Sequence, residues 1–194
     1  MKNLLAFISI AILATTQINA QEGVTPSFNK SDKVLNLGIG LGSTYYSGTY
    51  YSTTLPPVSA SFEMGVADEL IDGKGVIGVG GYVGYSAYKW ENTYPGYGTY
   101  GYKYTNLVIG ARGAFHYPLV DKLDLYTGIM LGYNIVSSSE FGDVYYGYDY
   151  STQSSSVAWS YYVGGRYYVS NSFAVMAELG YGIAYLNLGI SLKF

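Results

Sequence analysis

From residue 34 onward, large apolar residues alternate with small or polar ones at a period of two. In residues 123–136, for example, Leu125 and Ile129 fall on one face of an extended chain, whereas Asp124 and Gly128 fall on the other. This is the period of a β-strand, because successive side chains point to opposite faces. The pattern predicts eight strands, at residues 34–42, 57–67, 76–88, 105–117, 123–136, 157–169, 173–182 and 185–194.

Each predicted strand has about ten residues, the length that crosses a bilayer when the strand is tilted. One face of each strand is apolar, and the other holds glycine, serine, tyrosine or single charges. A sheet with one face in water would carry many more charged residues on that face. Glycine on so many strand positions suits tightly curved strands around a narrow lumen. The expected fold class is therefore all-β, an eight-stranded antiparallel up-and-down transmembrane β-barrel.

The predicted connections alternate in length. Long connections follow the first, third and fifth strands, and shorter ones follow the second, fourth and sixth. The long ones are residues 43–56, 89–104 and 137–156, and the shorter ones are residues 68–75, 118–122 and 170–172. Outer-membrane barrels have short periplasmic turns and longer extracellular loops, so both ends of the predicted barrel are expected on the periplasmic side. Aromatic residues near both rims would form the two interfacial belts: Tyr85, Tyr133, Trp159, Tyr161 and Tyr181 near the loops, and Phe115, Tyr117, Tyr167, Phe173 and Phe194 near the turns.

The composition of the chain excludes some classes of binding partner and some kinds of chemical site. The chain has 194 residues with 25 Tyr and 26 Gly, and only 12% of its residues are charged. Its net charge is −3 and it has no Lys/Arg cluster, so we expect no nucleic-acid partner. It has no cysteine, which excludes disulfides and thiolate metal sites.

The first residues have the features of an export signal. Lys2 precedes an apolar stretch at residues 4–14, and Ala20 offers a small residue for cleavage. An uncleaved anchor helix is the alternative, but the apolar stretch is short for one. We therefore expect a signal peptide at residues 1–20, a polar periplasmic lead-in at 21–33 and an outer-membrane β-barrel domain at 34–194.

Two stretches carry a resemblance to a known family. They are VIGARGAFHYPL followed by LDLYTGIMLGYN, within residues 108–134, and the terminal ELGYGIAYLNLGISLKF. The chain resembles the small eight-stranded outer-membrane β-barrels of OmpA/OmpX type. The resemblance implies an outer membrane of a Gram-negative type. It also implies that the last strand, with Ile190, Leu192 and terminal Phe194, is an assembly signal for the outer-membrane assembly machinery.

Single charges are expected inside the lumen. Glu63, Arg112, Arg166 and Glu178 would lie at mid-depth, with His116, Asp124 and Lys193 nearer the periplasmic mouth. We expect Arg166 and Glu178 to pair diagonally across the hairpin of strands 6 and 7. Buried charges need partners, and eight strands leave room for little more than side chains. A salt-bridged plug is favoured over a gate or a small ion path.

Catalytic, cofactor and metal sites are not expected. His116 is the only histidine, and it is placed at the periplasmic end of its strand without a neighbouring serine nucleophile. An envelope lipid-modifying enzyme would need such a pair near the external leaflet. Glu140, Asp143 and Asp149 share one long connection but lack the spacing of a calcium loop.

Tyrosine is concentrated in and beside the three long connections, among Ser, Gly and Thr. Binding loops use this mixture, because Tyr gives a large contact area and Ser and Gly give adaptability. The alternative is that the strands continue above the membrane as hairpins, with tyrosines stacked across strands. The candidate surface contacts are Tyr46, Tyr51, Tyr94, Tyr97, Tyr145 and Tyr148.

The sequence therefore predicts a monomeric, non-enzymatic barrel with a structural or surface-interaction role. Its expected partners are outer-membrane lipid, the assembly machinery and an extracellular ligand that the sequence does not identify. The alternative is a narrow porin-like channel for ions or small solutes, and a lipid-modifying enzyme is less favoured.

Overall fold

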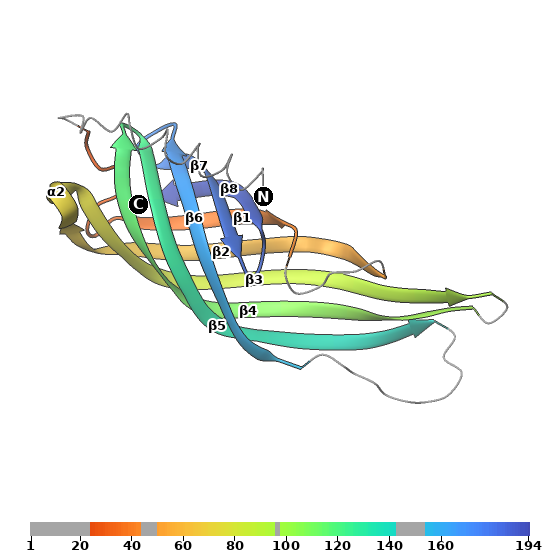
Figure 1. Cartoon of the computed structure of the whole chain (residues 1–194). Coiled ribbons are helices and arrows are strands. Elements are labelled where there is room, and N and C mark those ends of the chain that lie inside the picture. The colour runs from red at the N-terminus through yellow and green to blue at the C-terminus, as the bar shows by residue number, and fades with distance from the viewer. Residues whose placement is uncertain (1–23, 44–49, 96–97, 143–153) are drawn as a thin grey trace, which may run out of the picture.

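The computed structural model describes residues 24–43, 50–95, 98–142 and 154–194. Its eight strands form one closed antiparallel barrel in the order β1 to β8, with β8 paired back to β1 (Figure 1). This confirms the eight-stranded up-and-down barrel that the pattern predicts. The elements are β1 Lys33–Leu41, β2 Tyr51–Glu69, the five-residue turn α2 Leu70–Lys74, β3 Gly75–Tyr94, β4 Gly98–Val120, β5 Leu123–Gly142, β6 Ser156–Tyr168, β7 Phe173–Tyr181 and β8 Leu186–Lys193.

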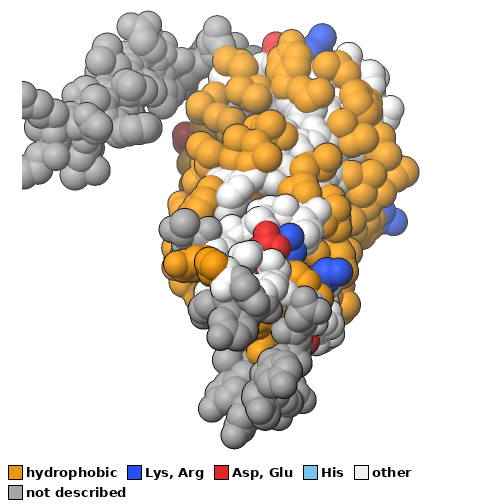
Figure 2. Space-filling view, turned by 90° about the vertical axis from the view of Figure 1, so that its right-hand side faces the viewer, with side chains coloured by type: hydrophobic (Ala, Val, Ile, Leu, Met, Phe, Trp, Pro, Cys, Tyr) orange, Lys and Arg blue, Asp and Glu red, His pale blue; other side chains and the backbone are white. Residues whose placement is uncertain are grey.

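The burial pattern is the reverse of that in a water-soluble barrel. Ile129 and Leu131 are 65% and 64% exposed, whereas Glu63 and Arg166 are buried. Hydrophobic side chains cover most of the described surface visible in Figure 2, and charged ones are few. The apolar faces therefore point outward and the polar faces line the lumen, as the alternation predicts. Separately, no helix among the described residues is long and apolar enough to span a membrane.

The strands differ greatly in length, and the barrel is therefore asymmetric. Strands β2 to β5 have 19, 20, 23 and 20 residues, whereas β6, β7, β8 and β1 have 13, 9, 8 and 9. The longer strands continue beyond the rest as a free-standing sheet (Figure 1). We call this part the projecting wall and define it as residues 51–57, 86–94, 98–106 and 134–142. From Tyr85 to Tyr94 it rises about 30 Å, at about 3.3 Å per residue.

The projecting wall corrects the predicted connections. Residues 89–104 belong mostly to paired strands, with Lys89 opposite Lys103 and Tyr94 opposite Gly98. Likewise, Tyr51 pairs with Trp90 within residues that the sequence assigns to a connection. The period of two continues here, and Tyr, Trp and Thr suit a pleated surface. The alternative of strands continued as hairpins is therefore confirmed for β3 and β4.

Candidate functional site: a lumen charge cluster and an aromatic wall

Four charged side chains from four strands meet in a closed ring inside the barrel. The Nε2 atom of His116 lies 2.7 Å from Oε1 of Glu63, and its Nδ1 atom lies 2.9 Å from Oδ1 of Asp124. Arg166 donates one hydrogen bond to Asp124 at 3.1 Å and another to Glu63. We call these four residues the ionic ring.

The ionic ring balances its own charge. Each ring nitrogen of His116 faces a carboxylate oxygen, so both nitrogens act as donors and the imidazole carries a positive charge. With Arg166, that gives two positive charges against the two carboxylates of Glu63 and Asp124. All four side chains are almost fully buried, where an unpaired charge would be costly.

The register between neighbouring strands brings the residues of the ionic ring close together. Asp124 and Arg166 are direct neighbours on β5 and β6. Glu63 reaches the ring over Gly78 of the adjacent strand β3, where a Cβ atom would collide with the Glu63 carboxylate. Glycine at this inward position therefore makes room for the charge in a narrow lumen.

A second cluster is built around Arg112, and we call it the arginine cluster. Arg112 donates to Glu178 at 2.7 Å, to the Tyr162 hydroxyl at 3.0 Å and to Ser61 at 3.2 Å. Its guanidinium lies 4.1 Å from the centre of the Tyr162 ring. Tyr126 also donates to Glu178, at 2.9 Å, and its ring lies 4.6 Å from the Arg166 guanidinium. Tyr126 thus connects the two clusters.

The polar lead-in crosses the end of the barrel nearest the ionic ring. Phe28 is 1% exposed, and its ring lies 4.4 Å from that of His116. The backbone of Ser31 donates to Gly65, and Gly65 donates back to Asp32. Asn29 comes so close to Gly65 that any Cβ there would collide with its carbonyl. Residues 24–32 are hereafter called the N-terminal segment.

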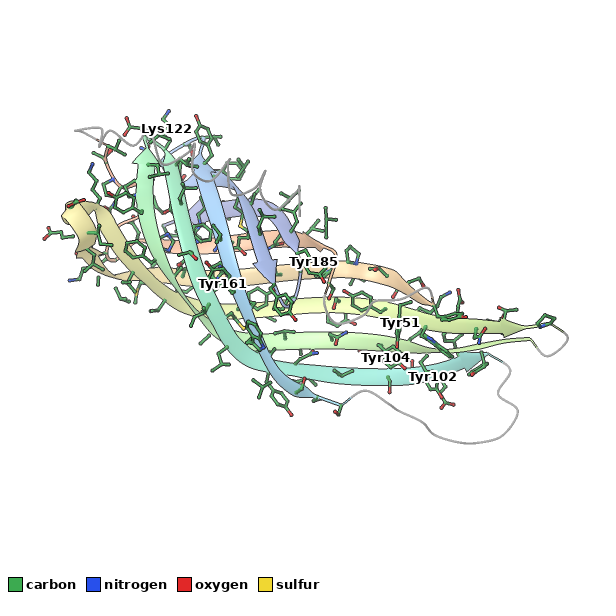
Figure 3. The ribbon with its side chains drawn as sticks, viewed as in Figure 1. Tyr51, Tyr102, Tyr104, Lys122, Tyr161 and Tyr185 are labelled. Carbon is green, nitrogen blue, oxygen red and sulfur yellow. The ribbon has the colours of Figure 1, made fainter. Side chains whose placement is uncertain are left out.

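The projecting wall carries aromatic rings on the face that continues the lumen side of the barrel. Tyr51, Trp90, Tyr102 and Glu140 form one row across β2 to β5. Ring centroids are 6.1 Å apart for Trp90 and Tyr102, and 5.6 Å apart for Trp90 and Tyr100. Figure 3 shows Tyr51, Tyr102 and Tyr104 together on the wall, with Lys122 at the opposite end of the molecule. We call this surface the aromatic face.

Glu140 ends the row as a hydrogen-bond acceptor. The Tyr102 hydroxyl donates to its carboxylate. Partial burial and the Glu140 carboxylate raise the pKa of Tyr102, so its phenol stays neutral and keeps this hydrogen bond. The row therefore has electron-rich rings beside one negative charge.

The outer face of the same wall is different. Lys89 and Lys103 both lie over the ring of Phe141, at 5.8 and 5.5 Å from its centroid. Lys89 also forms an ion pair with Glu91 at 2.6 Å. The basic residues of the described wall thus lie on its outer face.

No protein-family model and no curated protein match the sequence. Among solved structures, the chain is similar to the outer membrane protein OprG from Pseudomonas aeruginosa, at 11% identity and a TM-score of 0.48, over 87% of this chain and 99% of that one. It is also similar to the attachment invasion locus protein Ail of Yersinia pestis, at 8% identity and 0.44, over 84% and 96%. A de novo designed transmembrane β-barrel matches at 15% identity and 0.45, over 86% and 98%.

Its fold is similar to that of small outer-membrane β-barrels. At these identities the similarity concerns the fold alone.

The barrel brings together six of the seven charged residues predicted for the lumen, but not in the predicted pairs. The expected Arg166–Glu178 pair is wrong, because Arg166 bonds Glu63 and Asp124 while Glu178 bonds Arg112. Asp124 lies directly opposite Arg166 on the neighbouring strand β5, and the lumen is narrow enough for Glu63 to reach Arg166, and for Arg112 to reach Glu178, from non-adjacent strands. Lys193 lies apart from both clusters, where it donates to the Ser27 carbonyl and pairs with Asp32.

The predicted surface tyrosines are only partly described. Tyr46, Tyr97, Tyr145 and Tyr148 lie outside the described residues, and Tyr94 is described only as the last residue of β3. Tyr51 lies on the aromatic face. Sequence reasoning missed Trp90 and Phe28. Continued alternation from Tyr88 could have indicated Trp90, and a single aromatic residue in a polar lead-in was the one signal for Phe28.

Proposed function

We propose that the protein is an integral outer-membrane β-barrel with a surface-interaction role, and that it presents the projecting wall to the cell exterior. The observation that supports this best is the combination of an apolar outward surface on the barrel with an aromatic face on a wall beyond it. Exposed apolar side chains are unfavourable in water, whereas they are favourable in contact with the hydrocarbon core of a bilayer. Partly exposed Tyr and Trp above that band suit a contact surface.

The orientation follows from a difference between the two ends of the barrel, because β2 to β5 extend far beyond the other strands at one end only. The short connections between β4 and β5 and between β6 and β7 lie at the end opposite the projecting wall (Figure 1). Short turns are periplasmic in outer-membrane barrels, so the wall faces outward. The N-terminal segment and the ionic ring then lie at the periplasmic end.

A non-catalytic role is part of this proposal. Both ring nitrogens of His116 are engaged by carboxylates, so neither is free to activate a nucleophile. We also propose that the ionic ring, the arginine cluster and Phe28 together close the lumen to solutes. Support comes from their burial and from the small size of an eight-stranded lumen.

Because the chain contains no cysteine, single cysteines can report its orientation cleanly. Thr93→Cys places a thiol near the tip of the wall, and Asn171→Cys places one in the short turn between β6 and β7. We expect a membrane-impermeant maleimide to label Thr93→Cys on intact cells, and Asn171→Cys only after the outer membrane is permeabilised. The reverse pattern would overturn the orientation. A protein found soluble in the periplasm would overturn the proposal itself.

A narrow channel is the second candidate, because charged residues line the lumen. A small cavity of about 40 Å³ adjoins Arg112, Glu178 and Asn187, which is room for water molecules. Conductance across planar bilayers separates the two candidates. A steady open conductance that changes in Arg112→Gln or Arg166→Gln would show that the lumen is a channel and is not closed.

A further inference from the structure

The two faces of the projecting wall differ in charge. The pairing of β3 with β4 is continuous from the barrel to the tip, so alternate residues keep their faces along the wall. Among the described residues of the wall that share the face of Trp90, Glu140 alone carries a charge. Lys89, Glu91 and Lys103 lie on the other face. The aromatic face therefore has a carboxylate and no described base.

This arrangement is electrostatically complementary to a cation. The face of an aromatic ring carries partial negative charge, and an ammonium or guanidinium group over it is attracted. The wall already holds such contacts on its outer side, where Lys89 and Lys103 lie over Phe141. On the aromatic face, the rings and the Glu140 carboxylate beside Tyr102 together present negative charge. An anionic ligand would be repelled by the same groups.

The spacing of the rings suits an extended chain better than a single small cation. Among the partly exposed rings of the aromatic face, the centroid of Trp90 lies 5.6 Å from that of Tyr100 and 6.1 Å from that of Tyr102. Side chains on one face of an extended peptide repeat about every 7 Å. Successive cationic side chains of such a peptide could therefore each reach a ring.

We propose that the aromatic face binds a basic segment of a partner polypeptide in extended conformation. Its Lys or Arg side chains would lie over Trp90, Tyr102 and neighbouring rings, with one paired to Glu140. This inference rests on the proposed function, because the wall must reach the cell exterior to meet a partner.

The test uses the barrel in nanodiscs of zwitterionic lipid and a peptide that alternates arginine with serine. A matched peptide with citrulline in place of arginine keeps the shape and removes the charge. The chain has two tryptophans, so Trp159→Phe leaves Trp90 as the sole emitter. We expect the arginine peptide to change the emission of Trp90, and its affinity to fall as salt is raised. The citrulline peptide should leave the emission unchanged.

Matched variants locate the site, with fluorescence anisotropy of a labelled peptide as the readout. We expect Trp90→Ala and Glu140→Gln each to weaken binding about tenfold. Phe141→Ala, an aromatic truncation on the outer face beside Glu140, should leave the affinity unchanged. Heat-modifiable gel mobility shows whether each variant is folded.

Several outcomes would overturn the inference. Equal binding of the citrulline peptide, or binding that salt does not change, would indicate a neutral ligand such as a glycan. Equal losses in Trp90→Ala and Phe141→Ala would show that the aromatic face is not the site. Absence of binding by folded protein would also overturn it. If Thr93→Cys is still labelled on intact cells, the absence of peptide binding would contradict this inference but not the proposed function.

Discussion

The ring of Phe28 lies 4.4 Å from the imidazole of His116, centroid to centroid, and so joins the N-terminal segment to the ionic ring. Phe28 is also 5.7 Å from the guanidinium of Arg166. One apolar side chain from a polar segment thus covers the charges at this end of the lumen. The segment is held further by Lys193, which bonds Ser27 and Asp32.

Truncation of Phe28 should destabilise the barrel. We expect Phe28→Ala to lower the free energy of unfolding by about 3 kcal/mol, because a fully buried ring leaves a cavity and uncovers the ionic ring. Urea titration of the protein in detergent micelles measures the change. Ser27→Ala is the control, since Ser27 contacts Lys193 through its backbone carbonyl. Similar stabilities for the two variants would show that Phe28 contributes little.

The close approach of Asn29 to Gly65 gives a second prediction. A Cβ atom at residue 65 would collide with the Asn29 carbonyl, so Gly65→Ala should loosen the N-terminal segment. We expect trypsin to cleave after Lys30 several times faster in this variant, as local opening exposes the site. Gly113→Ala is the control, because its nearest neighbour would lie 3.9 Å from the new Cβ. Equal cleavage rates in both variants would contradict the docked arrangement.

The charge balance of the ionic ring predicts energetic coupling between Glu63 and His116. Each single change, Glu63→Gln or His116→Gln, leaves one uncompensated charge and should cost about 3 kcal/mol. The double variant restores neutrality, so its loss should be smaller than the sum by about 1–3 kcal/mol. A double-mutant cycle in urea measures this difference. Strict additivity would mean that the two side chains do not share a charge balance.

The apolar outward surface predicts a position-dependent cost for charge. Ile129→Arg, near the middle of the apolar part of β5, should destabilise the barrel by about 2–4 kcal/mol in lipid vesicles. Ser139→Arg lies on the same strand and the same face, but on the projecting wall, and should change stability little. Unfolding from vesicles compares the two. Equal costs would mean that the bilayer boundary does not lie between these residues.

Some features of this barrel could be predicted from the sequence, because they depend only on residues that are close together along the chain. Met130 is buried and Leu131 is exposed, and their order along β5 already assigns their faces. The alternation depends only on the two-residue period of a strand, so the face of each side chain can be assigned without knowing which strands are neighbours. The number of strands and the reversed polarity of the barrel followed from it.

The positions at which the strands end were harder to predict from the sequence. Residues 89–104 alternate as strands do, but their Tyr, Gly and Thr content also suits loops. Whether such a stretch pairs depends on a partner strand of matching length. Tyr100 pairs with Gly142 because β4 and β5 both continue beyond the point where β6 ends.

The amino-acid sequence by itself determined which side chains point into the lumen and which point outward, because that follows from the two-residue period of an extended chain. Only the tertiary structure decided that Arg166 bonds Glu63, that Arg112 bonds Glu178 and that Phe28 packs on His116. These partners lie on strands or segments far apart in the chain. Their contacts depend on the stagger of the closed sheet and the width of its lumen, which no local period encodes.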